Sequence, residues 1–131
     1  MEITISQVQG RVPITIMRLK GDFDYMSVDG FDREAKNAWE NGGKNFLIDM
    51  SGVPFMSSVG IRSIHHLYDL LHPAAAGEEK AIHRGVLDGT YKAPHLKLLS
   101  PTKRVFDSLK LTSLDMYIDI LDNEAEAIAA F

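Results

Sequence analysis

Two adjacent hydroxyls, Ser57 and Ser58, stand in the segment VPFMSSVGIRS, where an apolar run gives way to a glycine and an arginine. A serine in this position can cap a helix, because its oxygen accepts a backbone N–H that the first helical turn leaves unpaired. It can also serve as a nucleophile, or it can accept a phosphoryl group. Which of these applies depends on the residues around the pair.

The surrounding pattern argues against a hydrolase nucleophile. Such a serine belongs to a G-x-S-x-G turn between a strand and a helix. Ser58 and Gly60 fit the second half of the turn, but Met56 occupies the place of the first glycine, which must allow a strained backbone. No aspartate and histidine further along the chain stand out as the rest of a catalytic triad.

Phosphorylation of a hydroxyl at this point is physically favourable. The start of a helix offers unpaired N–H groups and the positive end of the helix dipole, and both stabilise a bound dianion. The modification adds about two negative charges. On an exposed surface, those charges can repel a docked partner without unfolding the domain. The residues alone leave capping and phosphorylation both open.

The five histidines do not form a chelating set. His65 and His66 are adjacent, so on a helix they point about 100° apart. His65 and His72 are two turns apart, which is too far for one ion. We therefore expect no metal site, and we expect no cofactor.

Composition limits the class of protein. The chain has 131 residues, 45% hydrophobic and 24% charged, which is typical of one soluble domain. It has no cysteine, which excludes disulfides and thiol catalysis. The net charge is -4 and the basic residues are scattered, so we expect no nucleic-acid binding. No apolar run is long enough for membrane insertion, and the N-terminus lacks a signal-peptide pattern, so we expect a cytoplasmic protein of undetermined oligomeric state.

Hydrophobic periodicity predicts alternating strands and helices. Expected strands cover about 3–6, 12–20, 45–50, 96–100 and 116–121. Expected helices cover about 27–41, 58–71 and 122–131, and one more helix begins at Ser100 and turns Val105, Phe106 and Leu109 inward. Ser27, the Ser100–Pro101 pair and Asp122 are the expected starts of three of the helices. Residues 72–93 lose the pattern, and we interpret them as a long loop with one helical turn.

The order β-β-α-β-α-β-α-β-α predicts an α/β fold with a mixed central sheet, parallel in its centre, and helices packed on it. Right-handed crossovers place every strand-to-helix loop at the same edge of such a sheet. Ser57 and Ser58 fall in one of these loops, at the carboxyl end of a central strand. In open α/β sheets, ligands usually bind at this edge.

The segment IDMSGVPFMSSVGIRSI resembles the signature of STAS domains of the anti-sigma factor antagonist type, D-x-S-x-V-x-F-h-D-S-x-G-h, where h is apolar. The matching residues are Asp49, Ser51, Val53, Phe55, Met56, Ser58, Gly60 and Ile61. Residues 21–24 match the family's upstream G-x-h-D element, and residues 96–121 resemble its later strand, helix and strand. The resemblance covers nearly the whole chain and implies a single STAS-like domain over residues 1–131.

The resemblance implies a switch protein without catalytic activity. When unmodified, such a domain binds an anti-sigma factor that is also a serine kinase, and a separate serine phosphatase later resets the modified form. The serine that the kinase modifies corresponds to Ser58, with Ser57 as second choice. The docking surface would include Asp24, Ser57, Ser58, Gly60 and Arg62. On this interpretation, Ser58 also caps its helix while it is unmodified.

Two features depart from the family pattern. Ser57 stands where the family usually has an aspartate, and residues 72–93 form an insertion where the family crosses in a few residues. Two other functions remain open: an unphosphorylated scaffold or accessory subunit of a transporter or sensor complex, and a module that binds a small ligand or nucleotide.

Overall fold

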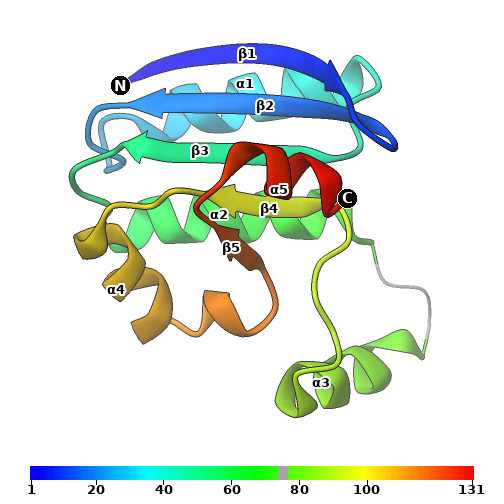
Figure 1. The fold of residues 1–131 in the computed structure, drawn as a ribbon. Coiled ribbons are helices and arrows are strands. Elements are labelled where there is room, and N and C mark those ends of the chain that lie inside the picture. The colour runs from blue at the N-terminus through cyan, green and yellow to red at the C-terminus, as the bar shows by residue number, and fades with distance from the viewer. Residues whose placement is uncertain (74–76) are drawn as a thin grey trace.

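Five strands form one sheet, and their order across the sheet is their order along the chain (Figure 1). They are β1 (Glu2–Gln9), β2 (Pro13–Lys20), β3 (Phe46–Gly52), β4 (Leu96–Leu99) and β5 (Asp119–Leu121). β1 and β2 pair antiparallel as a hairpin, and β2 to β5 pair in parallel. The structure is a computed structural model that describes residues 1–73 and 77–131. The predicted mixed sheet with a parallel centre is confirmed.

The helices cover the two faces of this sheet unequally. They are α1 (Val28–Glu40), α2 (Ser58–Leu71), α3 (Glu78–Asp88), α4 (Lys103–Leu111) and α5 (Glu124–Ala129), with a short 3-10 helix, η1 (Leu114–Met116). α1, α2 and α4 pack on one face, α5 packs on the other, and α3 stands apart below them in Figure 1. Within residues 1–73 and 77–131, no helix has both the length and the apolar character needed to cross a membrane.

The side-chain alternation of the strands explains the two layers. In β3, Phe46, Ile48 and Met50 point into the large core under α1, α2 and α4, while Leu47 points into the smaller core under α5. Each large apolar side chain buried in this way contributes about 1.5–3 kcal/mol to stability. The sheet is therefore held from both sides at β3, the strand that leads to the two serines.

The segment 72–93 is not the long loop that the sequence predicted. It contains α3, a helix of 11 residues, so the prediction of one helical turn was wrong. The helix was missed because it presents no apolar stripe to the main core: Gly85 is its one buried residue, and Leu87 is exposed. Residues 74–76 of the predicted loop lie outside the described residues.

Two helices begin later than predicted. α4 is capped by Thr102, whose Oγ1 accepts a hydrogen bond from the Val105 N–H, and not by Ser100. Ser100 is still tied to the sheet, because its N–H donates to the carbonyl of Leu121 at 2.7 Å. α5 is likewise capped by Asn123 and not by Asp122. In both cases the chain completes its last sheet contacts before it turns into the helix.

Candidate functional site

The end of β3 is braced by two residues of the sequence motif that lie within the strand. The carboxylate of Asp49 accepts hydrogen bonds from the N–H and the hydroxyl of Ser51, at 3.0 and 2.8 Å. On the α5 face, Arg18 donates to Asp49 at 2.9 Å and to Glu124 at 2.6 Å. Burial would raise the pKa of Asp49, but the bonds from Ser51 and Arg18 outweigh it and hold the pKa below its ordinary value. An ionised Asp49 therefore fixes the exit of β3.

Beyond the end of β3, the loop that follows β2 lies against the start of α2. The N–H of Phe23 donates to the carbonyl of Phe55, and the N–H of Ser57 donates to the carbonyl of Phe23, both at 2.9 Å. Phe23 is fully buried and its ring meets Phe31 of α1 at 4.7 Å between centroids. These contacts bring the loop of residues 22–27 beside the two serines.

Gly60 permits this close approach. A Cβ atom at this position would lie 2.6 Å from the carbonyl oxygen of Phe23 and 2.9 Å from the Cγ of Met56. Any larger residue would push the first turn of α2 away from the loop of residues 22–27. The glycine that the sequence placed in the docking surface thus has a packing role.

The two serines have different environments. Ser57 occupies the N-cap position of α2 but makes no capping hydrogen bond, and its Oγ is buried with no hydrogen-bond partner among the described residues. Ser58 is the first residue of the helix proper, and it is exposed. The expectation that Ser58 caps the helix was wrong, because the backbone places Ser57 one residue earlier at the cap.

The loop before α1 exposes two large side chains that sequence reasoning did not single out. Asp24 accepts a hydrogen bond from the Met26 N–H, and its own N–H donates to the Ser27 hydroxyl. This tight turn leaves Tyr25 78% exposed and Met26 86% exposed. Ser27 stands at the N-cap of α1, as predicted, but its hydroxyl binds inside the loop and does not cap the helix. The sequence signal that could have indicated them is that Tyr25 and Met26 lie in a short segment between Asp24 and Asp29.

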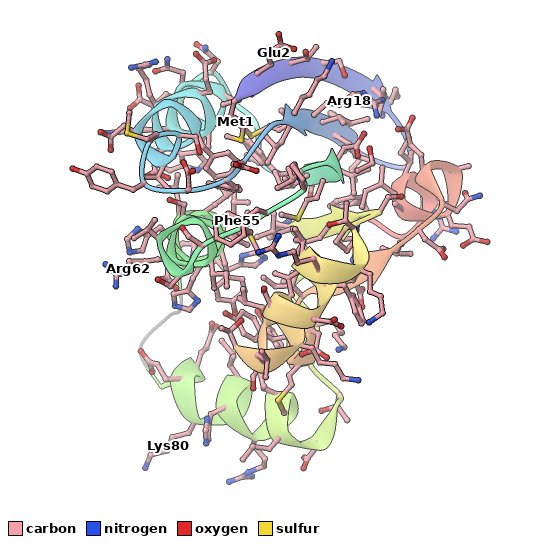
Figure 2. The ribbon with its side chains drawn as sticks, turned by 90° about the vertical axis from the view of Figure 1, so that its left-hand side faces the viewer. Met1, Glu2, Arg18, Phe55, Arg62 and Lys80 are labelled. Atoms are coloured by element: carbon pink, nitrogen blue, oxygen red, sulfur yellow. The ribbon has the colours of Figure 1, made fainter. Side chains whose placement is uncertain are left out.

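The remaining predicted residue, Arg62, lies one helical turn after Ser58. It is exposed and points away from α2, on the side of the sheet opposite Arg18 (Figure 2). Phe55 is partly buried, and the guanidinium of Arg104 from α4 lies 5.0 Å from the centroid of its ring. The structure thus brings Asp24, Ser57, Ser58 and Gly60 together, with Arg62 at the margin. Nowhere in residues 1–73 and 77–131 do three or more metal-binding side chains gather.

The fold is of the α/β class, with an exposed serine at the start of the second helix. Comparison of the sequence with family models identifies the family. The model of the STAS domain matches residues 6–76, and the chain belongs to that family. No curated protein sequence matches the chain.

Solved structures share the fold over nearly the whole chain. An anti-sigma factor antagonist from Mycobacterium paratuberculosis superposes with a TM-score of 0.71 at 16% identity, covering 98% of this chain and 93% of its own. SpoIIAA in its unphosphorylated form superposes with a TM-score of 0.68 at 17% identity, and the match covers 97% of this chain and 93% of SpoIIAA. The Bacillus cell fate determinant SpoIIAA in its phosphorylated form superposes with a TM-score of 0.63 at 17% identity, and the match covers 97% of this chain and 96% of that chain. At sequence identities this low, the comparison shows that the fold is shared.

Replacing Ser57 by alanine should not destabilise the protein. The substitution removes a buried hydroxyl without a hydrogen-bond partner, so we expect an unchanged or slightly higher free energy of unfolding in urea. Thr102→Ala is the matched control, because Thr102 does cap its helix, and it should lose about 1 kcal/mol. An equal loss in both variants would mean that the Ser57 hydroxyl stabilises α2.

Replacing Gly60 by alanine should destabilise the protein by about 1–3 kcal/mol, since the new methyl group overpacks against Phe23. Gly30→Ala in α1 is the control, because a Cβ there meets nothing within 4 Å. The free energy of unfolding of that variant should rise by up to about 1 kcal/mol, because alanine has a higher helix propensity than glycine. Urea unfolding of both variants measures the difference. A gain in both would show that α2 does not depend on the close approach.

Proposed function

We propose that the chain is an anti-sigma factor antagonist controlled by phosphorylation of Ser58. The unmodified form binds an anti-sigma factor that is also a serine kinase. That kinase then transfers the γ-phosphoryl group of ATP to the Ser58 oxygen, with loss of the hydroxyl proton and release of ADP, and the complex dissociates. A serine phosphatase restores the first form. The chain itself supplies no catalytic group, and the cycle would take place in the cytoplasm.

The observation that carries this proposal is the contrast in exposure between the two serines. Ser58 is exposed at the start of α2, whereas the Oγ of Ser57 is buried. A kinase must place the acceptor oxygen in its own active site, so a buried oxygen is a poor substrate. Membership of the STAS family and the likeness in fold to SpoIIAA, which has been solved in both forms, support the same choice.

Electrostatics explains how one phosphate could end the complex. The free N–H groups of the first turn of α2 stabilise the dianion, so the domain itself tolerates the modification. The surface beside it already carries Asp22 and Asp24, and the chain has a net charge of -4. Phosphorylation adds about two negative charges. At the centre of a docked surface these charges would lose their hydration without gaining an opposite charge, which costs binding free energy.

The docking surface would be centred on Ser58 and would include Asp24 and Arg62. The predicted partner residue Gly60 is buried, and it supports this surface by holding the first turn of α2 against the loop of residues 22–27. Tyr25 and Met26 extend the docking surface, because they are large, exposed and on the adjoining loop. Aromatic and methionine side chains are enriched in protein interfaces. Exposed apolar residues clustered beside polar ones are typical of such a surface. We therefore add both residues to the proposed interface.

Incubation with ATP and each serine-kinase candidate encoded by the same genome tests the acceptor. We expect the intact mass to rise by one phosphate in the wild type and in Ser57→Ala, and to stay unchanged in Ser58→Ala. Labelling confined to Ser57 would overturn the assignment. If no candidate labels the chain, the unphosphorylated scaffold or accessory subunit becomes the better interpretation.

Replacing Met26 by serine tests the proposed interface separately from phosphorylation. The kinase that labels the chain should bind this variant at least about tenfold more weakly, since an interface anchor contributes more than about 1.4 kcal/mol. Leu111→Ser is the matched control, because Leu111 is equally exposed, at 86%, but lies at the end of α4. Calorimetric titration measures both affinities. Equal weakening by the two variants would contradict the assigned surface.

A further inference from the structure

A second site of interest lies at the other half of α2, where this helix faces α3. A cavity of about 530 Å³ opens between the two helices and Tyr117, which directly follows η1. This volume is within the range of small-molecule sites. Its lining residues are His65, Tyr68, Asp69, His72, Pro73, Glu79, Ile82, His83, Val86 and Tyr117. The nearest of them, His65, is seven residues along α2 from Ser58, so the cavity is distinct from the proposed phosphorylation site.

Aromatic side chains build one wall of this cavity. The rings of Tyr68 and Tyr117 meet edge to face at 5.0 Å, and the ring of His72 stacks on Tyr68 at 4.5 Å. The Tyr117 hydroxyl is bound to His65 Nδ1, and the Tyr68 hydroxyl to that of Tyr91, both at 2.7 Å. Because these hydroxyls already have partners, the wall offers a ligand mainly its flat apolar surface.

The wall is also rigidly held. His72 Nε2 accepts a hydrogen bond from the N–H of His95 at 3.0 Å, so its Nδ1 carries the proton and donates to the carbonyl of Tyr68 at 2.8 Å. Burial is the main cause that lowers the pKa of His72, and it keeps this imidazole neutral. Burial likewise raises the pKa of Tyr117 to about 12. His72 and Tyr117 therefore carry no charge at physiological pH.

Two carboxylates, Asp69 and Glu79, line the cavity, and among its described lining residues there is no lysine and no arginine. Asp69 lies 3.5 Å from Nε2 of His65, which lines the cavity together with His83, so Glu79 is the carboxylate without an imidazole beside it in this pair. Lys80 points away from α2 (Figure 2). Lys80 and Arg84 line an adjoining recess, which shares Glu79 and His83 with the cavity. A phosphate or carboxylate in the cavity would face two carboxylates and would find imidazoles in place of a lysine or arginine, whereas a positive charge would be attracted.

We propose that this cavity binds a small organic cation with a flat apolar body, such as an aromatic amine. The ring of the ligand would lie against Tyr68, Tyr117, Ile82 and Val86, and its ammonium group would face Asp69 and Glu79. Aromatic faces attract cations as well as apolar groups, which adds to the charge complementarity. The site gives the inserted helix α3 a role, because α3 supplies one of the two walls.

The test uses tryptamine as probe and indole-3-acetate as its anionic counterpart, each titrated into the full chain labelled with ¹⁵N. We expect saturable amide shifts for tryptamine, confined to residues 65–73, 79–86 and 117, and none for indole-3-acetate. Equal binding of the two compounds, shifts centred elsewhere, or no saturable shift at millimolar tryptamine would each overturn the proposal.

Two variants locate the site. Asp69→Asn, at an exposed carboxylate, should weaken tryptamine binding about two- to fivefold, whereas Asp29→Asn on α1 should leave it unchanged. Val86→Phe should abolish binding by filling the cavity, with amide spectra of the sheet unaltered. Equal binding by Asp69→Asn and Asp29→Asn would contradict the charge argument. Ser58→Ala should bind tryptamine normally, so this proposal stands or fails independently of phosphorylation.

Discussion

The site depends on the close contact between the loop after β2 and the start of α2. Phe23 donates its N–H to Phe55 and accepts from Ser57, while its ring is buried against α1. The contact is possible because Gly60 has no side chain to block the carbonyl of Phe23. One backbone segment thus fixes where α2 begins, and so which serine lies at the cap and which one faces solvent.

Helix α2 carries two different chemistries along its length. Its first residue, Ser58, is polar, exposed and close to the loop that carries Tyr25 and Met26, which suits a protein partner and a reversible charge. Its second half is aromatic and faces α3 across a cavity with acidic residues. Between the two, Ile64 and Leu67 anchor the helix in the core. A rigid, buried middle allows both ends to be used for recognition.

The sequence predicted those elements that bury an apolar pattern. β2 and α2 followed from the period of their hydrophobic residues and β3 from its short apolar run, because each of them packs against the main core. α3 was not predicted, since its contacts are aromatic and local and leave most of its surface exposed. The helix starts at Thr102 and Asn123 were displaced for another reason: pairing between Ser100 and Leu121 continues past the strands, and periodicity does not record such backbone bonds.

The sequence by itself determined the order of strands and helices, the STAS motif, and the place of Ser57 and Ser58 at the end of a central strand. These are consequences of local patterns and of the rule that parallel strands end at one edge. Only the tertiary structure decided that the Ser57 oxygen is buried and Ser58 exposed, that Tyr25 and Met26 stand beside them, and that α3 and α2 form an open cavity between them. Burial depends on which distant segments meet, and no local pattern contains that information.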